Sequence, residues 1–171
     1  LMTYLAAQTS TIRLGTAVMV LPWHDPVLLA EQTATLDLLS GGRFDFGVGK
    51  GYRFNEFKGF KIPMEDAGER FEESLKIMTK AWTEDETWSY DGKYWSYDEI
   101  IVEPPTAQQP HPPFWMGAGS PESIELVANR GYNLLVDQFA PVETTIGRVN
   151  TFRDSVEARG RTFNPYEVGV A

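Results

Sequence analysis

The sequence predicts an α/β fold built on a parallel sheet. Apolar runs rich in Val, Leu and Ile lack a polar alternation, which is typical of strands covered on both faces. A helical segment with capping residues follows each run, and four such units occur before a fifth begins. This order fits an open doubly wound sheet or a barrel. A complete barrel takes about 250 residues, and both chain ends lie inside predicted elements, so we favour a partial barrel in a piece of a longer protein.

The first unit follows a helical segment at residues 1–10. Its strand is the run TIRLGTAVMVLP at residues 11–22. Asp25 as N-cap and Pro26 in the first turn begin a helix, which the glycine pair after Ser40 ends. Three leucines of this helix are expected in the core: Leu29, Leu36 and Leu39.

The second unit begins with the strand RFDFGVG at residues 43–49, in which side chains alternate between two faces. Phe44, Phe46 and Val48 share one face, and the small or polar residues share the other. A loop follows, and then a helix over residues 69–82. Its expected core positions have helical spacing: Phe71, Leu75, Met78 and Trp82.

Residues 84–113 do not follow the alternation of strands and helices and are predicted to form an excursion over the surface. The stretch WSYDGKYWSY suggests a hairpin about an Asp91-Gly92 turn, and a Pro-rich connection follows. The remaining strands and helices then alternate. We expect strands at 113–119, at 133–139 and from Glu167, and helices at 120–131 and 142–160.

Composition excludes several classes of protein. The formal net charge is −9 and the basic residues are scattered, which argues against a nucleic-acid or acidic membrane partner. The chain has no cysteine and only two histidines, too few for a metal site of either type. No apolar run approaches the roughly 18 residues that a membrane span needs. We therefore expect a cytoplasmic protein with no bound metal.

Three strand ends carry candidate chemistry, because parallel strands direct their carboxyl ends toward one site. In GTAV, the small residues Thr16 and Ala17 leave room for a flat ligand, or simply fit a tight barrel interior. In GVGKG, the glycines at 47, 49 and 51 allow a ligand close to the backbone, and Lys50 offers a charge to an anion. A solvated lysine in a glycine-rich turn is the equal alternative.

The third strand end, GAGSPES, has the pattern of a phosphate-binding helix start. Gly117 and Gly119 precede Ser120 as N-cap, and Ser123 adds a hydroxyl in the first turn. Free N–H groups and the positive end of the helix dipole attract anions there. An ordinary capped helix explains the same residues. The convergence of a basic residue and this helix start on nearby strands favours a phosphorylated cofactor.

The chain resembles the bacterial luciferase-like flavin-dependent monooxygenases over nearly its whole length. The resemblance lies in the ordered combination of IRLGTAV, LLAEQTATLDLLSGGRFDFGVGKGY, ERFEESLKIMTKAW, DGKYW, PPFWMGAGS and ANRGYN. It implies a (β/α)8 TIM barrel present from about the third to the seventh strand across residues 1–171. It also implies reduced FMN as cofactor, with O2 and a small organic molecule as substrates. A related branch uses the deazaflavin F420 for hydride transfer.

The resemblance assigns cofactor-binding roles to seven residues. A non-prolyl cis peptide at Ala17-Val18 would lie beneath the flavin ring, Lys50 would meet the phosphate, and Tyr52 would lie near the ribityl chain. The phosphate loop falls on three residues: Gly119, Ser120 and Ser123. Luciferases proper have an acid where Gly119 stands, so bioluminescence is not expected. Glu56 is equally compatible with an acid near the flavin and with a surface position.

The catalytic residues are unknown from this sequence. The family's histidine near the reacting carbon belongs to an earlier strand, so the chain alone is expected to be inactive. The resemblance further implies a flavin reductase as supplier of reduced flavin and a homodimer packed through the early helices. Two alternatives stay open: an F420-dependent oxidoreductase, and a non-catalytic flavin-binding subunit.

Overall fold

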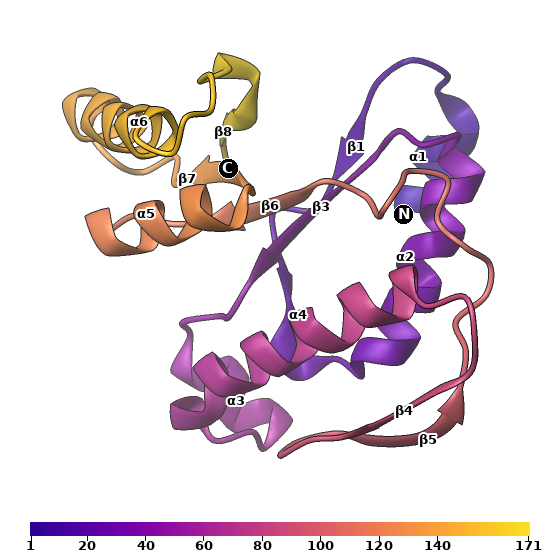
Figure 1. Ribbon diagram of the computed structural model, residues 1–171. Helices are drawn as coiled ribbons and strands as arrows, with labels where there is room; N and C mark the ends of the chain where they lie inside the picture. Colours follow the sequence, from indigo (N-terminus) through magenta and orange to yellow (C-terminus); the bar gives the residue numbers. More distant parts are fainter. The chain divides into compact units, whose positions relative to one another are not determined.

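A computed structural model describes residues 1–171 and confirms the order of alternating strands and helices (Figure 1). The parallel strands are β1 (Leu14–Gly15), β3 (Phe44–Gly49), β6 (Phe114–Gly117), β7 (Asn133–Val136) and β8 (Val168–Val170), and β2 (Met19–Val20) also pairs with β3. The excursion contains β4 (Trp88–Asp91) and β5 (Ser96–Ile100). The helices are α1 (Met2–Gln8), α2 (Pro26–Ser40), α3 (Phe54–Phe60), α4 (Ala67–Thr83), α5 (Pro121–Arg130) and α6 (Val142–Glu157). Short 3-10 turns cover Leu21–Trp23, Met64–Asp66 and Pro165–Glu167.

The strand order identifies the type of sheet. The hydrogen-bonded order β1-β3-β6-β7-β8 follows the order of the chain, and the paired strands along it are all parallel. A doubly wound sheet requires this order to reverse at one point, and no reversal occurs here. The winding is therefore that of a (β/α) barrel, of which the chain forms a part.

The chain divides into two compact units, which are described separately. The first comprises residues 1–15, 20–45 and 49–112, and the second comprises residues 16–19, 46–48 and 113–171.

In the first unit, α2 packs against α1 and α4. The predicted caps of α2 are confirmed, since the Asp25 carboxylate accepts from the N–H groups of Val27 and Leu28 and Gly41 has a φ of 68°. All four predicted core residues of α4 are buried. Leu29 and Leu36 of α2 are also buried, but the prediction for Leu39 is wrong. Leu39 is 60% exposed, because the buried face of α2 runs through Thr33, Leu36 and Ser40 and leaves it outside.

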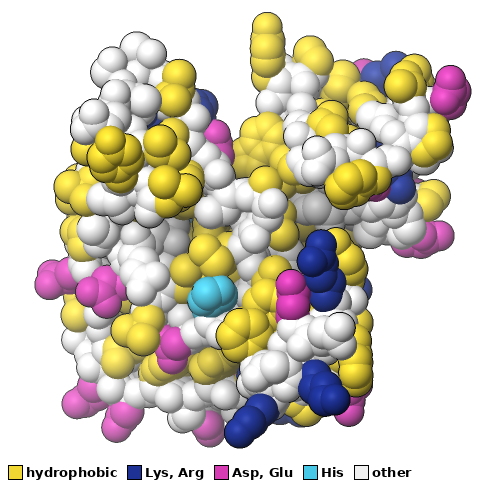
Figure 2. Space-filling model, turned by 180° about the vertical axis from the view of Figure 1, so that it is seen from behind, with side chains coloured by type: hydrophobic (Ala, Val, Ile, Leu, Met, Phe, Trp, Pro, Cys, Tyr) yellow, Lys and Arg dark blue, Asp and Glu magenta, His cyan; other side chains and the backbone are white.

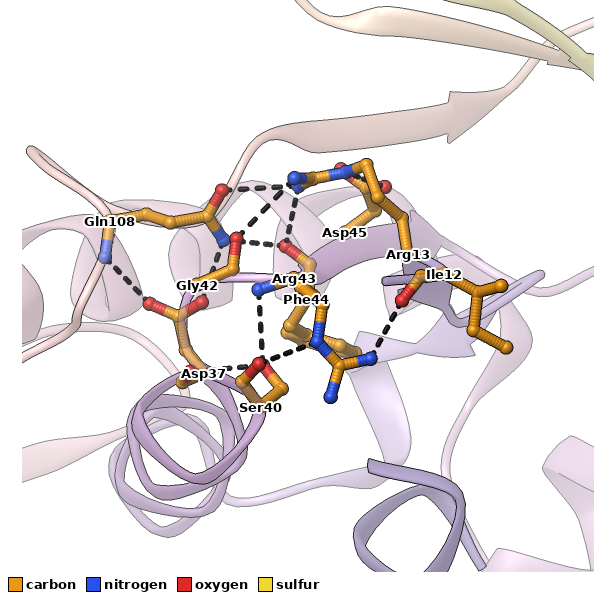
Figure 3. Close-up of polar contacts among 9 residues, drawn as sticks. All are labelled: Ile12, Arg13, Asp37, Ser40, Gly42, Arg43, Phe44, Asp45 and Gln108. Carbon is orange, nitrogen blue, oxygen red and sulfur yellow. Dashed lines mark hydrogen bonds and ion pairs between the residues drawn. The ribbon is translucent and has the colours of Figure 1, made fainter. Parts of the chain in front are cut away.

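A buried polar network ties the Pro-rich connection to α2 and β3 (Figure 3). Asp37 is fully buried, and its carboxylate accepts from the backbone N of Gln108 at 2.8 Å and from Nε2 of the same side chain at 2.6 Å. Gln108 Nε2 also donates to the Phe44 carbonyl at 2.7 Å, and its Oε1 accepts from Arg13 at 3.1 Å. Arg13 in turn holds Asp45 through two 2.8 Å contacts. These bonds satisfy a carboxylate that burial would otherwise penalise.

The β4–β5 hairpin is confirmed, but its turn is longer than predicted. Asp91 pairs with Ser96, so the loop spans residues 92–95 rather than centring on Asp91-Gly92. The Glu73 carboxylate of α4 accepts from the backbone N–H groups of Tyr94 and Trp95, each at 3.2 Å. This side chain fixes the loop on α4, and within the loop the Gly92 N–H donates to the Trp95 carbonyl at 3.0 Å.

In the second unit, α5 packs against α6 and both contact β7. The alternation predicted for β3 is confirmed, since Phe46 and Val48 are buried and pair with β6. A Cβ at Gly169 would lie 3.0 Å from Leu135 and 3.4 Å from Trp115, so these two half-buried side chains share the other face of the sheet. Small residues at strand positions on this face leave room for them.

The surface has a dispersed charge pattern on the face that Figure 2 shows. Basic side chains there stand apart from one another among acidic and hydrophobic ones. A continuous basic patch of the kind that neutralises phosphates of nucleic acids is absent from this face. No helix combines the length and the apolar character that crossing a membrane requires.

Candidate functional site

The predicted strand at residues 11–22 is interrupted where its candidate site residues lie. β1 ends at Gly15 and β2 begins at Met19, and the peptide bond between Ala17 and Val18 is cis. The cis bond at this position agrees with the expectation from the family resemblance. Ala17 is exposed and Val18 is 37% exposed, so this peptide is accessible to a ligand. The Thr16 hydroxyl donates to the Gly47 carbonyl at 2.7 Å and anchors the segment to β3.

Close packing within the chain requires glycine at two positions of GVGKG. A Cβ at Gly47 would lie 1.7 Å from the carbonyl oxygen of Thr16, so only glycine lets the two backbones approach. Gly51 has a φ of 79°, and a Cβ there would lie 2.8 Å from Val20 and 2.9 Å from Phe57. Packing of the chain therefore explains these two glycines without a ligand, which differs from the explanation that the sequence suggested.

Lys50 and Tyr52 follow β3 in the first unit, and both are exposed. The Lys50 ammonium can therefore meet an anion from solvent. Tyr52 is 76% exposed, and the guanidinium of Arg53 lies 5.7 Å from its ring centroid. Glu56, on α3, forms an ion pair with Arg53 at 3.9 Å. α3 itself was predicted as loop.

The start of α5, in the second unit, is a capping box made of two serines. The Ser120 hydroxyl accepts from the Ser123 backbone N at 3.3 Å, and the Ser123 hydroxyl accepts from the Ser120 backbone N at 3.1 Å. The helix start is therefore capped by its own side chains, as in the ordinary capped helix that the sequence left open. The two hydroxyls also donate within this box, Ser120 Oγ to Ser123 Oγ at 3.2 Å and Ser123 Oγ to the Ser120 carbonyl at 2.8 Å. The box lies at the surface, because Ser120 is exposed and Ser123 half-buried.

Sequence reasoning missed Arg148, a residue of α6 that contacts the loop before α5. Its Nε donates to the Gly119 carbonyl at 3.1 Å, and its Nη1 lies 2.5 Å from Oδ2 of Asp137. The hydrogen bond from Arg148 holds the pKa of Asp137 below its usual value. Arg148 lies 29 residues from Gly119 in a helix of ordinary composition, so no local pattern in the sequence could have identified it.

The predicted site residues thus fall into two groups. Lys50 and Tyr52 belong to the first unit, and the other five belong to the second: Ala17, Val18, Gly119, Ser120 and Ser123. Each group follows the carboxyl end of a parallel strand, as expected. Their convergence on one ligand stays a prediction.

Parallel strands wound in chain order define an α/β-barrel protein, and glycine-rich and serine-capped segments follow the carboxyl ends of its strands. The chain belongs to the luciferase-like monooxygenase family, whose model matches residues 1–171.

Three similar proteins illustrate this membership. The oxygenase component of flavin-dependent trigonelline monooxygenase from Acinetobacter baylyi is 31% identical over 86% of this chain and 42% of its own length. FMNH2-dependent dimethylsulfone monooxygenase from Pseudomonas putida is 29% identical over 91% of this chain and 43% of its own length. The crystal structure of the monooxygenase RslO1 from Streptomyces bottropensis superposes with a TM-score of 0.88 at 28% identity, covering 99% of this chain and 52% of that one.

The chain spans about two fifths of the length of the curated relatives that it matches, with values of 37% to 43%. Activities named for those proteins therefore belong to polypeptides more than twice as long as the matched region.

Proposed function

We propose that this chain is part of the oxygenase component of a flavin-dependent monooxygenase, which uses reduced FMN and O2 to oxygenate a small organic molecule. The observation that carries the proposal is the family match over all 171 residues. The names of the trigonelline and dimethylsulfone enzymes, one of which is an oxygenase component, support it further. A separate flavin reductase would supply the reduced flavin, since an oxygenase component implies a reducing partner. We further propose that the full-length protein is a cytoplasmic homodimer, and that residues 1–171 supply the third to the seventh barrel strand.

The donor chemistry of the strand ends fits the phosphate of FMN. Lys50 would pair with the phosphate as a point charge, without the two-pronged geometry that arginine offers. The hydroxyls of Ser120 and Ser123 would bind phosphate oxygens by reorienting out of the capping box. Gly119 would let the phosphate approach the backbone. Lys50, Gly119 and Ser120 are exposed and Ser123 is half-buried, and the two serines bond to each other rather than to a buried network.

The remaining predicted residues would orient the flavin itself. The exposed residues Ala17 and Val18 would lie against the ring, and Tyr52 would cover the ribityl chain. Reduced FMN would supply the electrons that activate O2. The residues of this chain would bind and orient that cofactor and exclude water from its reacting face.

Oxygen consumption tests this proposal. The full-length protein is supplied with FMN, NADH and a flavin reductase, and consumption and product formation are followed for small heterocyclic and sulfur-containing substrates. We expect substrate-dependent product that requires the oxygenase. If product is absent while F420 supports hydride transfer, the protein is the F420-dependent oxidoreductase. If FMN binds and neither reaction occurs, it is the non-catalytic flavin-binding subunit.

A further inference from the structure

The loop between β6 and α5 is held by one side chain from outside the predicted site. Arg148 of α6 donates from Nε to the carbonyl oxygen of Gly119 at 3.1 Å. Its guanidinium also lies flat against this residue, because a Cβ at Gly119 would be 3.1 Å from Nη2 and 3.4 Å from Cζ. A side chain at position 119 would therefore require the guanidinium to shift by a few tenths of an ångström.

The guanidinium is itself fixed by Asp137, which directly follows β7. The contact from Arg148 Nη1 to Asp137 Oδ2 is 2.5 Å, and the other carboxylate oxygen accepts from the backbone N of Phe139 at 3.0 Å. The side chain of Arg148 is only 20% exposed, although that of Asp137 is 50% exposed. Arg148 thus joins the carboxyl ends of two neighbouring strands, β6 and β7, through directional bonds.

This contact determines which way the loop presents its polar groups. In a trans peptide the carbonyl and the following N–H point in opposite directions. Because the Gly119 carbonyl points toward Arg148, the N–H of Ser120 points the other way, where it meets the Ser123 hydroxyl at 3.1 Å. A carbonyl turned toward a phosphate would repel it, and Arg148 prevents that orientation.

We propose that Arg148 is a positioning residue for the phosphate of the flavin: by holding the Gly119 carbonyl, it keeps this oxygen turned away from the side on which the capping box lies, where the phosphate would replace the contacts between the two serines. This inference rests on the proposed function, because it assumes that the loop binds the phosphate of FMN. A guanidinium is needed for this role, since it makes the two contacts from a rigid planar fork that an ammonium lacks.

The test compares FMN with riboflavin, which has the same ring and lacks the phosphate. Dissociation constants for both are measured by fluorescence titration of the full-length protein and of Arg148→Met, Arg148→Lys and Arg153→Met. Arg153 is the matched control, because it lies on the same helix and pairs only with its neighbour Asp154. We expect Arg148→Met to weaken FMN binding about tenfold, the loss typical of one charge-assisted hydrogen bond. Riboflavin binding should stay within about twofold of wild type, inside the context scatter of such contacts.

The Lys variant separates positioning from charge. If Arg148 positions the loop, Arg148→Lys keeps the charge and still shows most of the loss of FMN affinity, whereas Arg153→Met shows none. Equal loss of FMN and riboflavin affinity in Arg148→Met, or full rescue by lysine, would overturn the inference and leave the proposed function intact. A wild-type protein that binds neither FMN nor riboflavin would overturn the proposed function, and this inference with it.

Discussion

Buried Asp37 is the residue on which the packing of the Pro-rich connection most depends. Its two carboxylate oxygens bind the backbone and side chain of Gln108, which also reaches the Phe44 carbonyl and Arg13. The sequence placed Asp37 in a helix, and nothing local distinguished it from a solvated acid. Its partner is 71 residues away, so its role could only emerge from the tertiary structure.

Replacing Asp37 by alanine should therefore destabilise the protein strongly. Asp37→Ala leaves two donors of Gln108 without their acceptor, and we expect a loss of about 2 to 3 kcal/mol in the free energy of unfolding. Urea denaturation followed by tryptophan fluorescence measures this. Glu31→Gln, an exposed change on the same helix, should alter it by less than about 0.5 kcal/mol. Equal stability of the two variants would show that the network contributes nothing.

Gly47 was identified from the sequence as a residue that leaves room for a ligand. In the structure, glycine is needed there because the backbone of Thr16 lies against it. The Gly47→Ala change would place a methyl group 1.7 Å from the Thr16 carbonyl oxygen, so the segment before Ala17-Val18 must move. We expect at least about 2 kcal/mol of destabilisation from this overpacking, together with weaker flavin binding.

Gly59→Ala is the matched control for this change. Gly59 lies in α3, and a Cβ added there would have no neighbouring atom within 4 Å, so alanine should be neutral or stabilising by up to about 1 kcal/mol. Thermal unfolding and FMN titration of both variants compare them. A Gly47→Ala variant as stable as Gly59→Ala would contradict the close backbone approach.

Among the elements, those with local signals were predicted and those set by tertiary contacts were not. α2 was found because Asp25 and Gly41 mark its ends, and α4 because its apolar residues repeat with helical spacing. α3 was missed because its N-cap, Arg53, provides no side-chain cap and the helix is fixed by burial of Phe57. The strand at 11–22 was predicted as continuous because its break at residues 16–18 depends on the approach of β3.

Attachment of β5 to the start of α2 should depend on pH. Tyr97 donates from its hydroxyl to Asp25 Oδ2 at 3.0 Å, and burial, followed by the Asp25 charge, raises the pKa of Tyr97. A raised pKa means that the folded state favours the protonated phenol. Its contribution to stability is therefore complete below the unfolded value of about 10 and is lost as the pH rises above it.

The Tyr97→Phe variant should accordingly lose less stability than wild type between pH 8 and about 11. Urea denaturation at several pH values measures the difference. Tyr166→Phe is the control for the removal of a phenol hydroxyl, because Tyr166 is 87% exposed. Identical slopes for wild type and Tyr97→Phe would show that this phenol does not couple β5 to α2.

For the molecule as a whole, the sequence predicted the barrel fold and the family, but it did not predict the geometry of the site. Alternating strands and helices indicated a parallel sheet, and the strand order excludes the doubly wound alternative. The residues at the strand ends were predicted from glycine, lysine and serine patterns. Arg148, which orients the Gly119 carbonyl, came only from the structure.

The central claim is that the serines at the start of α5 bind the phosphate of FMN. The most direct measurement is the affinity of the full-length protein for FMN and for riboflavin, in wild type, Ser120→Ala, Ser123→Ala and the double variant. We predict that each single change weakens FMN binding about tenfold or more and spares riboflavin. Equal affinity of wild type for FMN and riboflavin, or FMN binding unaffected by either change, would contradict the claim.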